Sequence, residues 1–333
     1  MVDHIEELEK WRRAGQPLAI ARVVSTWRSS PRPAGSALVV TANGEMMGSV
    51  SGGCVEKAVV AKALKVIETG QSELVSYGVA DEDAWEVGLS RGGALTVYIQ
   101  PFFANDLWEE SQAASAADAG RILLTKMDES GTNYLIDPND AAPAYPEVIL
   151  KEKSLELYRL GKNVIIEGEK GTYFQQSLPP KPKMFLIGSA HIASELTGLA
   201  HLYGFDTVLI DPRDTFAKKT HYTSQPGMVH VKWPQEILPE LALNRDTYIV
   251  ILSHDPKIDD EALKLVLRSE VRYIGALGSR KTHAKRVARL QGYGFNDEEI
   301  ARVKAPIGLN IGSHSAAEIA LSIMAQVIEA KNS

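Results

Sequence analysis

The residue with the clearest chemical potential is Cys54, the only cysteine among the 333 residues. It follows the glycine pair Gly52-Gly53 and precedes a run from Glu56 to Ile67 whose apolar residues recur at helical spacing. That spacing predicts a helix, so the thiol would stand at a helix N-terminus, where converging backbone amides favour a thiolate or a ligand phosphate. Free cysteines are also among the most often buried residues, so a small buried cysteine beside a tight turn is the alternative.

Composition limits the classes of protein that fit. The chain is 44% hydrophobic and long enough for two domains with separate cores. Its formal net charge of -6, with no block of Lys and Arg, argues against a nucleic-acid partner. A single cysteine excludes an intrachain disulfide or a zinc site with several thiolates and fits a reducing compartment.

The sequence also bears on targeting. The segment from Met1 to Arg13 has the pattern of a charged amphipathic helix rather than a signal peptide. No apolar run approaches the roughly 18 residues that a membrane span needs. We therefore expect a cytoplasmic protein that binds neither nucleic acid nor membrane.

The clearest domain boundary is the segment Ser177–Lys183, because it holds three prolines in a short polar stretch. It predicts an N-terminal domain over residues 1–178 and a C-terminal domain over residues 183–333. In the N-terminal part, residues 18–27 predict a strand and residues 37–50 a hairpin. The dipeptide Asn43-Gly44 favours a type I′ turn in that hairpin, with positive φ at both residues. Further strand or helical patterns occupy residues 72–79, 94–101, 120–127, 131–136, 145–160, 163–167 and 171–176.

Strands alternate with helices after the boundary. This alternation predicts an α/β domain in which helices cover both faces of a parallel sheet. The predicted strands span residues 184–187, 207–210, 228–231, 248–252 and 272–275, and the predicted helices span residues 192–203, 259–269, 279–291 and 316–331.

A dinucleotide-binding pattern falls at the first strand-to-helix turn of this domain. Gly188 matches the first glycine of G-x-G-x-x-G/A, but Ala190 replaces the second, and its methyl group limits how closely a pyrophosphate can approach. Asp211 follows about 20 residues later, where an acidic residue can bind ribose hydroxyls. The pattern predicts a Rossmann-like doubly wound sheet. The alternative is a tight turn that binds no nucleotide.

Other polar clusters follow later strands of the same sheet. His254, Asp255 and Asp259 can hold a metal or orient a ligand; alternatively, Asp255 forms an Asx turn and Asp259 caps the next helix. The segment Gly275–Arg280 repeats a glycine loop before a helix, where Arg280 and Lys281 can meet an anion. The alternative there is a capped surface helix. His314, before the last helix, and Glu318, at helical spacing from it, fit a capping interaction.

Eight ordered segments carry a resemblance to a known family: Pro33-Ala34-Gly35, Gly48–Glu56, Gly88–Gly93, Gly188–Ala193, Asp211-Pro212-Arg213, Ser253–Lys257, Gly275–Arg280 and Pro306–Leu309. Together they resemble the XdhC/CoxI family, accessory proteins that bind molybdenum cofactor and support maturation of xanthine dehydrogenase and related molybdenum hydroxylases. The resemblance covers nearly both domains.

The resemblance implies binding rather than turnover. The protein would hold molybdenum cofactor (molybdopterin), protect it while a cysteine desulfurase supplies sulfide in place of an oxo ligand, and deliver it to apo xanthine dehydrogenase or a related enzyme. Cys54 would contact the metal or its sulfur, and the C-terminal domain would face it across a cleft. A nucleotide such as NAD(P) is a further candidate at the Rossmann-like domain, and we expect a homodimer. The expected cofactor-binding residues are Ser51, Gly52, Gly53, Cys54, Arg91, Gly92, Gly93, Gly188, Ala190, His191, Asp211, Arg213, His254, Asp255, Gly278, Ser279 and Arg280.

One position departs from the family pattern. Many relatives carry a second cysteine before the later glycine pair, where this chain has Arg91. Arg91 can contact the phosphate or dithiolene region of the cofactor, or it can form an exposed salt bridge. Two other functions remain open at this point. One is an NAD(P)-dependent oxidoreductase that uses the C-terminal domain, and the other is a redox sensor that uses the thiol of Cys54.

Overall fold

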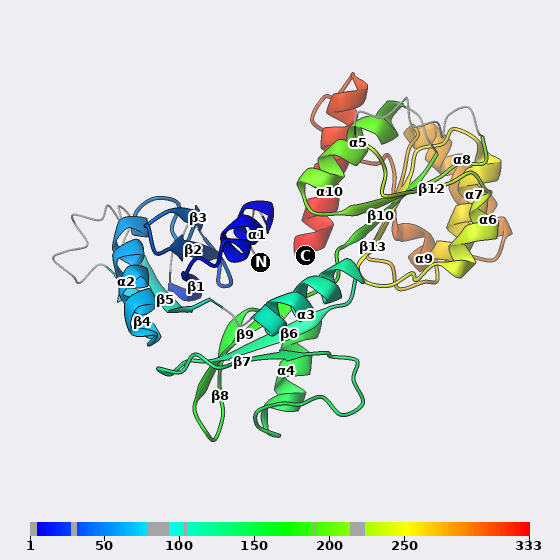
Figure 1. Cartoon of the computed structure of the whole chain (residues 1–333). Helices are drawn as coiled ribbons and strands as arrows, with labels where there is room; N and C mark the ends of the chain where they lie inside the picture. The colour runs from blue at the N-terminus through cyan, green and yellow to red at the C-terminus, as the bar shows by residue number, and fades with distance from the viewer. Residues whose placement is uncertain (1–4, 28–31, 79–92, 103–104, 189–190, 214–223) are drawn as a thin grey trace. The chain divides into compact units, whose positions relative to one another are not determined.

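The computed structural model describes residues 5–27, 32–78, 93–102, 105–188, 191–213 and 224–333 (Figure 1). The chain divides into two compact units, residues 1–180 and residues 181–333. In the described parts of the chain, no helix is both long enough and apolar enough to cross a membrane.

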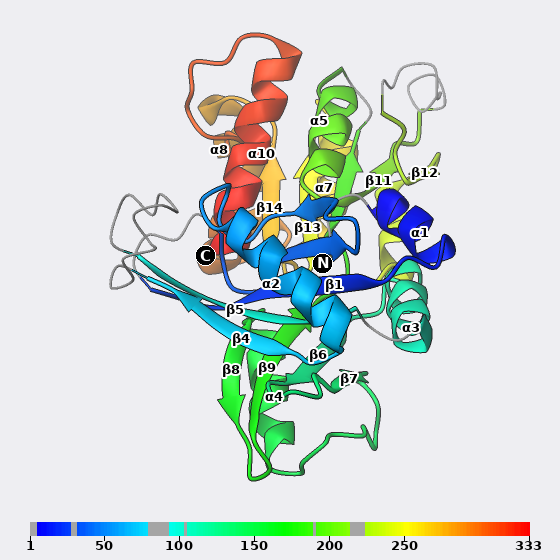
Figure 2. The same ribbon diagram turned by 60° about the vertical axis from the view of Figure 1, so that its left-hand side comes forward.

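The first unit is built on a five-stranded antiparallel sheet. Its strands are β1 (Leu18–Trp27), β2 (Ala37–Thr41), β3 (Met46–Gly48), β4 (Glu73–Tyr77) and β5 (Ala94–Pro101), in the order β3-β2-β1-β5-β4. Helix α2 (Glu56–Thr69) lies across one face (Figure 2), where Val59 and Ala63 pack against the buried side chains of the sheet. The predicted strands at 18–27 and 94–101 and the predicted helix at Glu56 are confirmed.

A second antiparallel sheet completes this unit. It contains β6 (Arg121–Lys126), β7 (Asn133–Ile136), β8 (Val164–Glu167) and β9 (Thr172–Leu178), in the order β7-β6-β9-β8, with α1 (Ile5–Arg13), α3 (Asn105–Ala116) and α4 (Leu150–Arg159) as the helices. Leu8 of α1, Trp108 of α3 and Leu123 of β6 share one core with the five-stranded sheet. Arg22 of β1 is fully buried and donates to Thr125 of β6 at 2.7 Å, and burial lowers its pKa to about 10.

The hairpin formed by β2 and β3 has a different turn from the predicted one. The amide of Thr41 donates to the carbonyl of Glu45 at 2.9 Å, so three residues connect the strands. Gly44 has a φ of 80°, whereas Asn43 lies outside the positive-φ region. The predicted type I′ turn is therefore wrong, because a three-residue connection needs a left-handed residue only at its last position.

The second unit is a six-stranded parallel sheet. Its strands are β10 (Lys183–Ile187), β11 (Asp206–Ile210), β12 (Met228–His230), β13 (Thr247–Ile251), β14 (Tyr273–Ala276) and β15 (Val303–Lys304), in the order β12-β11-β10-β13-β14-β15. The first strand is central, and the chain builds one half outward before it crosses to the other side of β10. This is the Rossmann order, so the predicted doubly wound sheet is confirmed. Ligands in such sheets bind at the carboxyl ends of the strands where the order reverses, here β10 and β13.

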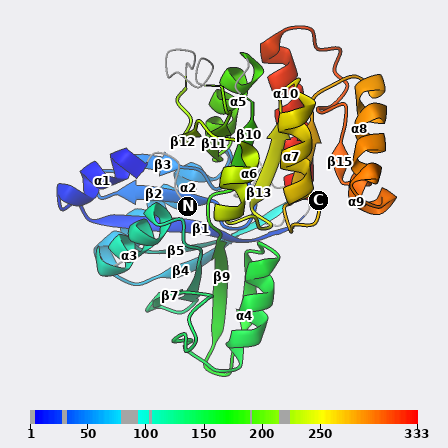
Figure 3. The same cartoon turned by 90° about the vertical axis from the view of Figure 1, so that its right-hand side faces the viewer.

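Helices cover both faces of this sheet (Figure 3). Helices α5 (His191–Leu202) and α10 (Ala316–Asn332) pack on one face. The other face is covered by α6 (Pro234–Ile237), the 3₁₀ helix η3 (Leu238–Glu240), α7 (Pro256–Val266), α8 (Arg280–Gly292) and α9 (Asp297–Ala301). Helix α7 begins at Pro256 rather than at the predicted Asp259. The cause is Asp255, whose side chain accepts from the amide of Lys257 and caps the helix, while proline suits the first helical position.

Candidate functional site

The loop between β3 and α2 folds around the carboxylate of Glu56. The carboxylate accepts four backbone amides and two hydroxyls from the preceding residues. The amide donors are Val50, Ser51, Gly52 and Gly53, at 2.8–3.2 Å, and the hydroxyl donors are Ser49 at 2.7 Å and Ser51 at 2.5 Å. The amides therefore converge as the sequence predicted, but the anion that they hold is a side chain of the protein itself.

The electrostatics of Glu56 follow from this cradle. The residue is only 6% exposed, and burial by itself raises its pKa. The hydrogen bonds from Ser51 and Ser49 outweigh that effect, and the pKa falls from 4.5 to about 2. Glu56 is thus an ionised internal anchor that fixes the loop.

Cys54 stands at the end of this loop, two residues before α2 begins. Its side chain is partly buried and packs against the core formed by α2 and the five-stranded sheet. Gly52 and Gly53 have φ values of 78° and 118°, and both are exposed, so no side chain from these two positions covers the approach to the thiol. The exposure of Cys54 is therefore intermediate: the thiol is less buried than a purely structural cysteine and less open than a surface thiol.

A polar cavity of about 260 Å³ adjoins the loop through Ser49. Gly35 lines it, and a Cβ at that position would lie 2.5 Å from Nδ2 of Asn163, so only glycine fits. Gln176 also lines it and donates to the carbonyl of Gly35 at 3.1 Å, while its Oε1 has no donor among the described residues. The sequence analysis identified Gly35 but missed Asn163, which precedes β8, and Gln176 of β9, because residues that meet only through tertiary packing carry no local signal.

Of the later glycine pair, Gly93 is buried immediately before β5. Arg91 and Gly92 lie outside the described residues, as does Ala190 in the second unit. Their predicted roles stay predictions.

In the second unit, Gly188 follows β10 and lies against the backbone after β13. It has a φ of 98°, and a Cβ there would lie 2.8 Å from the amide nitrogen of Ser253. These two chain segments approach closely at the point where the strand order reverses, the place where sheets of this kind bind their ligands.

We expect Gly188→Ala to lower the free energy of unfolding by about 3 kcal/mol, because it combines a left-handed backbone with a backbone clash. Gly204→Ala is the matched control: its φ is 78°, but a Cβ there would meet nothing within 4 Å, so only the backbone term of about 1 kcal/mol applies. Urea denaturation followed by circular dichroism measures both. Equal losses in the two variants would show that the contact with Ser253 is unimportant.

Asp211 lies at the end of β11, where the sequence placed a ribose-binding acid. It is fully buried, and its carboxylate accepts from the guanidinium of Arg213 at 2.9 and 2.8 Å. The hydrogen bonds that Arg213 donates to the carboxylate of Asp211 raise the pKa of Arg213. A ribose would have to displace this ion pair. His191, the first residue of α5, is exposed.

The cluster after β13 separates into two structural interactions. Asp255 caps α7, which confirms the alternative interpretation for that residue. Asp259 does not cap the helix as predicted; its carboxylate accepts from Ser253 at 2.6 Å and from Arg286 at 2.9 Å. His254 is exposed, and nowhere in the described ranges do three or more His, Cys, Asp or Glu side chains form a group suited to a metal ion.

The predicted caps of two other helices are confirmed. Ser279 accepts from the amide of Thr282 and caps α8, after Gly278 with a φ of 137°. Arg280, the first residue of α8, is exposed. Glu318 accepts from the amides of His314 and Ser315 at the start of α10.

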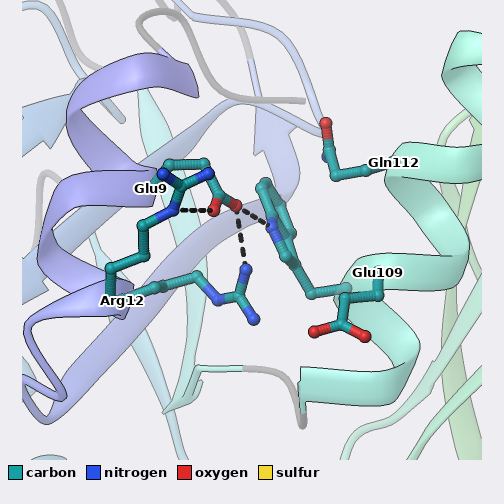
Figure 4. Close-up of a pocket in the computed structure, with 6 residues that line it drawn as sticks. Glu9, Arg12, Glu109 and Gln112 are labelled. Carbon is teal, nitrogen blue, oxygen red and sulfur yellow. Dashed lines mark hydrogen bonds and ion pairs between the residues drawn. The ribbon is translucent and has the colours of Figure 1, made fainter.

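A cavity of about 610 Å³ lies between α1 and α3 (Figure 4). Glu9 of α1 accepts from the indole of Trp108 at 2.5 Å and from Arg12 at 2.8 Å, and the Trp108 bond lowers the pKa of Glu9. Glu109 and Gln112 project from α3 on the other side. The carboxylate of Glu9 is bound both to Arg12 of its own helix and to Trp108 of α3. We therefore interpret these residues as a structural link between α1 and α3.

Comparison with known proteins decides the family. The model for the XdhC Rossmann domain matches residues 184–327, and the model for the XdhC and CoxI family matches residues 11–78. The chain belongs to the XdhC and CoxI family. The resemblance drawn from the sequence is therefore confirmed, and the XdhC Rossmann match coincides with the six-stranded parallel sheet.

Individual relatives are similar along nearly the whole chain. A Bacillus subtilis protein named as a probable xanthine dehydrogenase subunit is 23% identical over 94% of this chain and 92% of its own length. The molybdenum cofactor insertion chaperone PaoD from Escherichia coli is 25% identical over 94% of this chain and 83% of its own length. A crystal structure described as a xanthine dehydrogenase from Bacillus halodurans matches with a TM-score of 0.78 at 25% identity, covering 99% of this chain and 96% of that chain.

Proposed function

We propose that this protein is a cytoplasmic accessory factor that binds molybdenum cofactor as cargo and inserts it into xanthine dehydrogenase or a related molybdenum hydroxylase. The observation that carries the proposal is the similarity over 94% of the chain to a relative named as a molybdenum cofactor insertion chaperone. The lone, partly exposed thiol on a loop of fixed shape supports it.

In this proposal Cys54 contacts the molybdenum atom or its sulfur, since thiolates bind soft transition-metal centres. The exposed glycines before it leave room for a bulky guest. The adjoining cavity suits the polar edge of a pterin ring, because polar side chains such as Ser49, Asn163 and Gln176 line it. Glu56 holds the loop in place and does not itself meet the cargo.

The finer steps belong to the same proposal. A cysteine desulfurase takes the sulfur of cysteine as a persulfide, and a thiol reductant, itself oxidised to a disulfide, releases that sulfur as hydrosulfide. With one proton the hydrosulfide replaces an oxo ligand of the cargo, which leaves as water. The loaded protein, as a homodimer, then meets the apo enzyme. Arg91 replaces the second cysteine of many relatives, so this protein would act with the one thiol of Cys54.

Cofactor retention tests the proposal. The purified full chain, mixed with molybdenum cofactor and passed over gel filtration, should retain a fluorescent pterin together with molybdenum. Cys54→Ala should retain about tenfold less molybdenum, as expected when a direct contact of a metal centre is lost. Ser76→Ala, a change at an exposed position in β4, is the control and should match the unaltered protein.

Two results would contradict the proposal. One is an unaltered protein that retains no pterin, and the other is a Cys54→Ala variant with full molybdenum content. A nucleotide such as NAD(P) at the second unit is a separate candidate that the Rossmann strand order supports. The residues fit it only in part, because Asp211 is bound to Arg213. Hydride transfer from NAD(P)H to a small carbonyl compound, without pterin retention, would favour an oxidoreductase instead.

A further inference from the structure

A cavity of about 410 Å³ in the second unit lies at the carboxyl ends of β13 and β14. Its lining comes from the segments that follow these strands, from the start of α7 and from one side of α8 as far as Arg289. Figure 3 shows where α7 and α8 lie beside the sheet. The cavity is large enough for a small molecule, since ligand pockets begin at about 300 Å³.

One face of α8 brings a row of cations to this cavity. Lys281, Lys285 and Arg289 are spaced four residues apart, so they lie one above the other on the helix, and all three line the cavity. Arg289 is bound to Asp260, whereas Lys281 and Lys285 are exposed. Like charges at this spacing destabilise an isolated helix by a few tenths of a kcal/mol per pair, so the row opposes helix stability unless an anion lies against it.

Arg286 adds a buried charge to the same lining. Its side chain is 1% exposed, and its Nη2 donates to Asp259 at 2.9 Å and to the carbonyl of Leu277 at 3.0 Å. Within the described part of the chain, its Nε and Nη1 have no hydrogen-bond acceptor. Buried guanidinium donors are normally satisfied, so Arg286 places a buried cation with two unpaired donors beside the cavity.

The start of α8 supplies further donors. Helix α8 has 13 residues, and its capping residue Ser279 lines the cavity beside Gly278 and Thr282. A helix N-terminus carries a partial positive charge and favours anions. Asp259 is the acidic residue of the lining, and it is already engaged by Arg286 and Ser253.

We propose that this cavity binds the phosphate or diphosphate group of a small molecule, with Lys281 and Lys285 as the contacting cations and Arg286 behind them. The site lies at the carboxyl ends of β13 and β14, and it shares Ser253 with the turn at Gly188. Of the two residues that the sequence offered for an anion, Lys281 lines the cavity and Arg280 does not, and Lys285 adds a second cation one turn further along the helix. The proposal is independent of the cargo at Cys54.

Isothermal titration of inorganic phosphate and of pyrophosphate into the full chain, at fixed ionic strength in chloride, tests the site. Saturable binding is expected, and Lys281→Gln and Lys285→Gln should each weaken it about fivefold to tenfold. Both residues are exposed, so the variants should fold normally. The control is Lys304→Gln, an exposed lysine of β15 outside the cavity, which should change affinity less than twofold, about the effect of a distant screened charge. Equal affinity for the two probes indicates a monoester ligand, and tighter pyrophosphate binding indicates a diphosphate; either supports the site.

Three outcomes would overturn the proposal. The first is the absence of saturable binding by either probe. The second is an equal loss in Lys304→Gln, which would mean that only the overall charge matters. The third is a loss in Arg280→Gln without any in Lys281→Gln and Lys285→Gln, which would move the anion to the outer face of the helix.

Discussion

Glu56→Gln is expected to lower the free energy of unfolding of the first unit by about 2 to 3 kcal/mol and to release the loop that carries Cys54. The substitution keeps the size of the side chain but removes the charge that the four amides and two hydroxyls share. Hydrogen bonds to a charged acceptor are the stronger kind, and an amide NH₂ placed among donors leaves some of them unsatisfied. Urea denaturation measures the loss, and faster alkylation of Cys54 by iodoacetamide reports the released loop.

The same carboxylate should make stability depend on pH. The pKa of Glu56 is about 2 in the folded protein and ordinarily 4.5, so its contribution is fully present above pH 4.5 and is lost as pH falls toward 2. Glu56→Gln should remove this part of the acid dependence. Glu68→Gln, an exposed position on the same helix, is the control and should leave both stability and acid dependence unchanged. A Glu56→Gln variant as stable as the Glu68→Gln variant would refute the anchoring role.

Arg286→Met is expected to cost the second unit about 3 to 5 kcal/mol, the typical effect of leaving a buried charge without its partner. Asp259 is 4% exposed, and burial already raises its pKa while Ser253 and Arg286 oppose that rise. Without Arg286 the pKa of Asp259 should rise further. An acid with a raised folded pKa loses stability as pH increases above its unfolded value, so the loss should be larger at pH 7 than at pH 4.

A compensating variant separates the ion pair from packing. Arg286→Met combined with Asp259→Asn should recover much of the lost stability, because it removes both buried charges. Arg289→Met breaks the neighbouring, partly exposed pair with Asp260 and should cost only about 1 kcal/mol. If Arg286→Met and Arg289→Met were equally mild, the buried pair would not stabilise the fold. Urea denaturation at the two pH values measures all three variants.

The regular elements could be predicted because their signals are local. The helical spacing after Glu56 predicts α2, and the apolar run at residues 184–187 predicts β10. The alternation of strands and helices after β10 indicates the parallel sheet. The start of α7 was misplaced because Asp259 resembles a cap as much as Asp255 does. The capping residue is decided by the Pro256 that follows Asp255.

The candidate site could be predicted only in part. Cys54 and its glycines were visible in the sequence, but the role of Glu56 was not, since it requires the loop to fold back over the first residue of α2. The sequence signal for this role was a serine, Ser51, placed five residues before the acidic Glu56, whose carboxylate it binds. Gln176 comes from β9 of the second sheet and Asn163 from the connection before β8. Arg286 meets Asp259 across 27 residues. Such pairings arise from tertiary packing alone.

The carboxylate of Glu56, which holds the loop in place, affects how the proposed cargo would bind and be released. Because the group that shapes the loop belongs to the polypeptide, the loop has its conformation without a guest. Under the proposed function, binding of the cargo would then spend little free energy on ordering this segment. The lifetime of the complex would depend mainly on the contacts at the thiol and the adjoining cavity, as a carrier that must release its cargo requires.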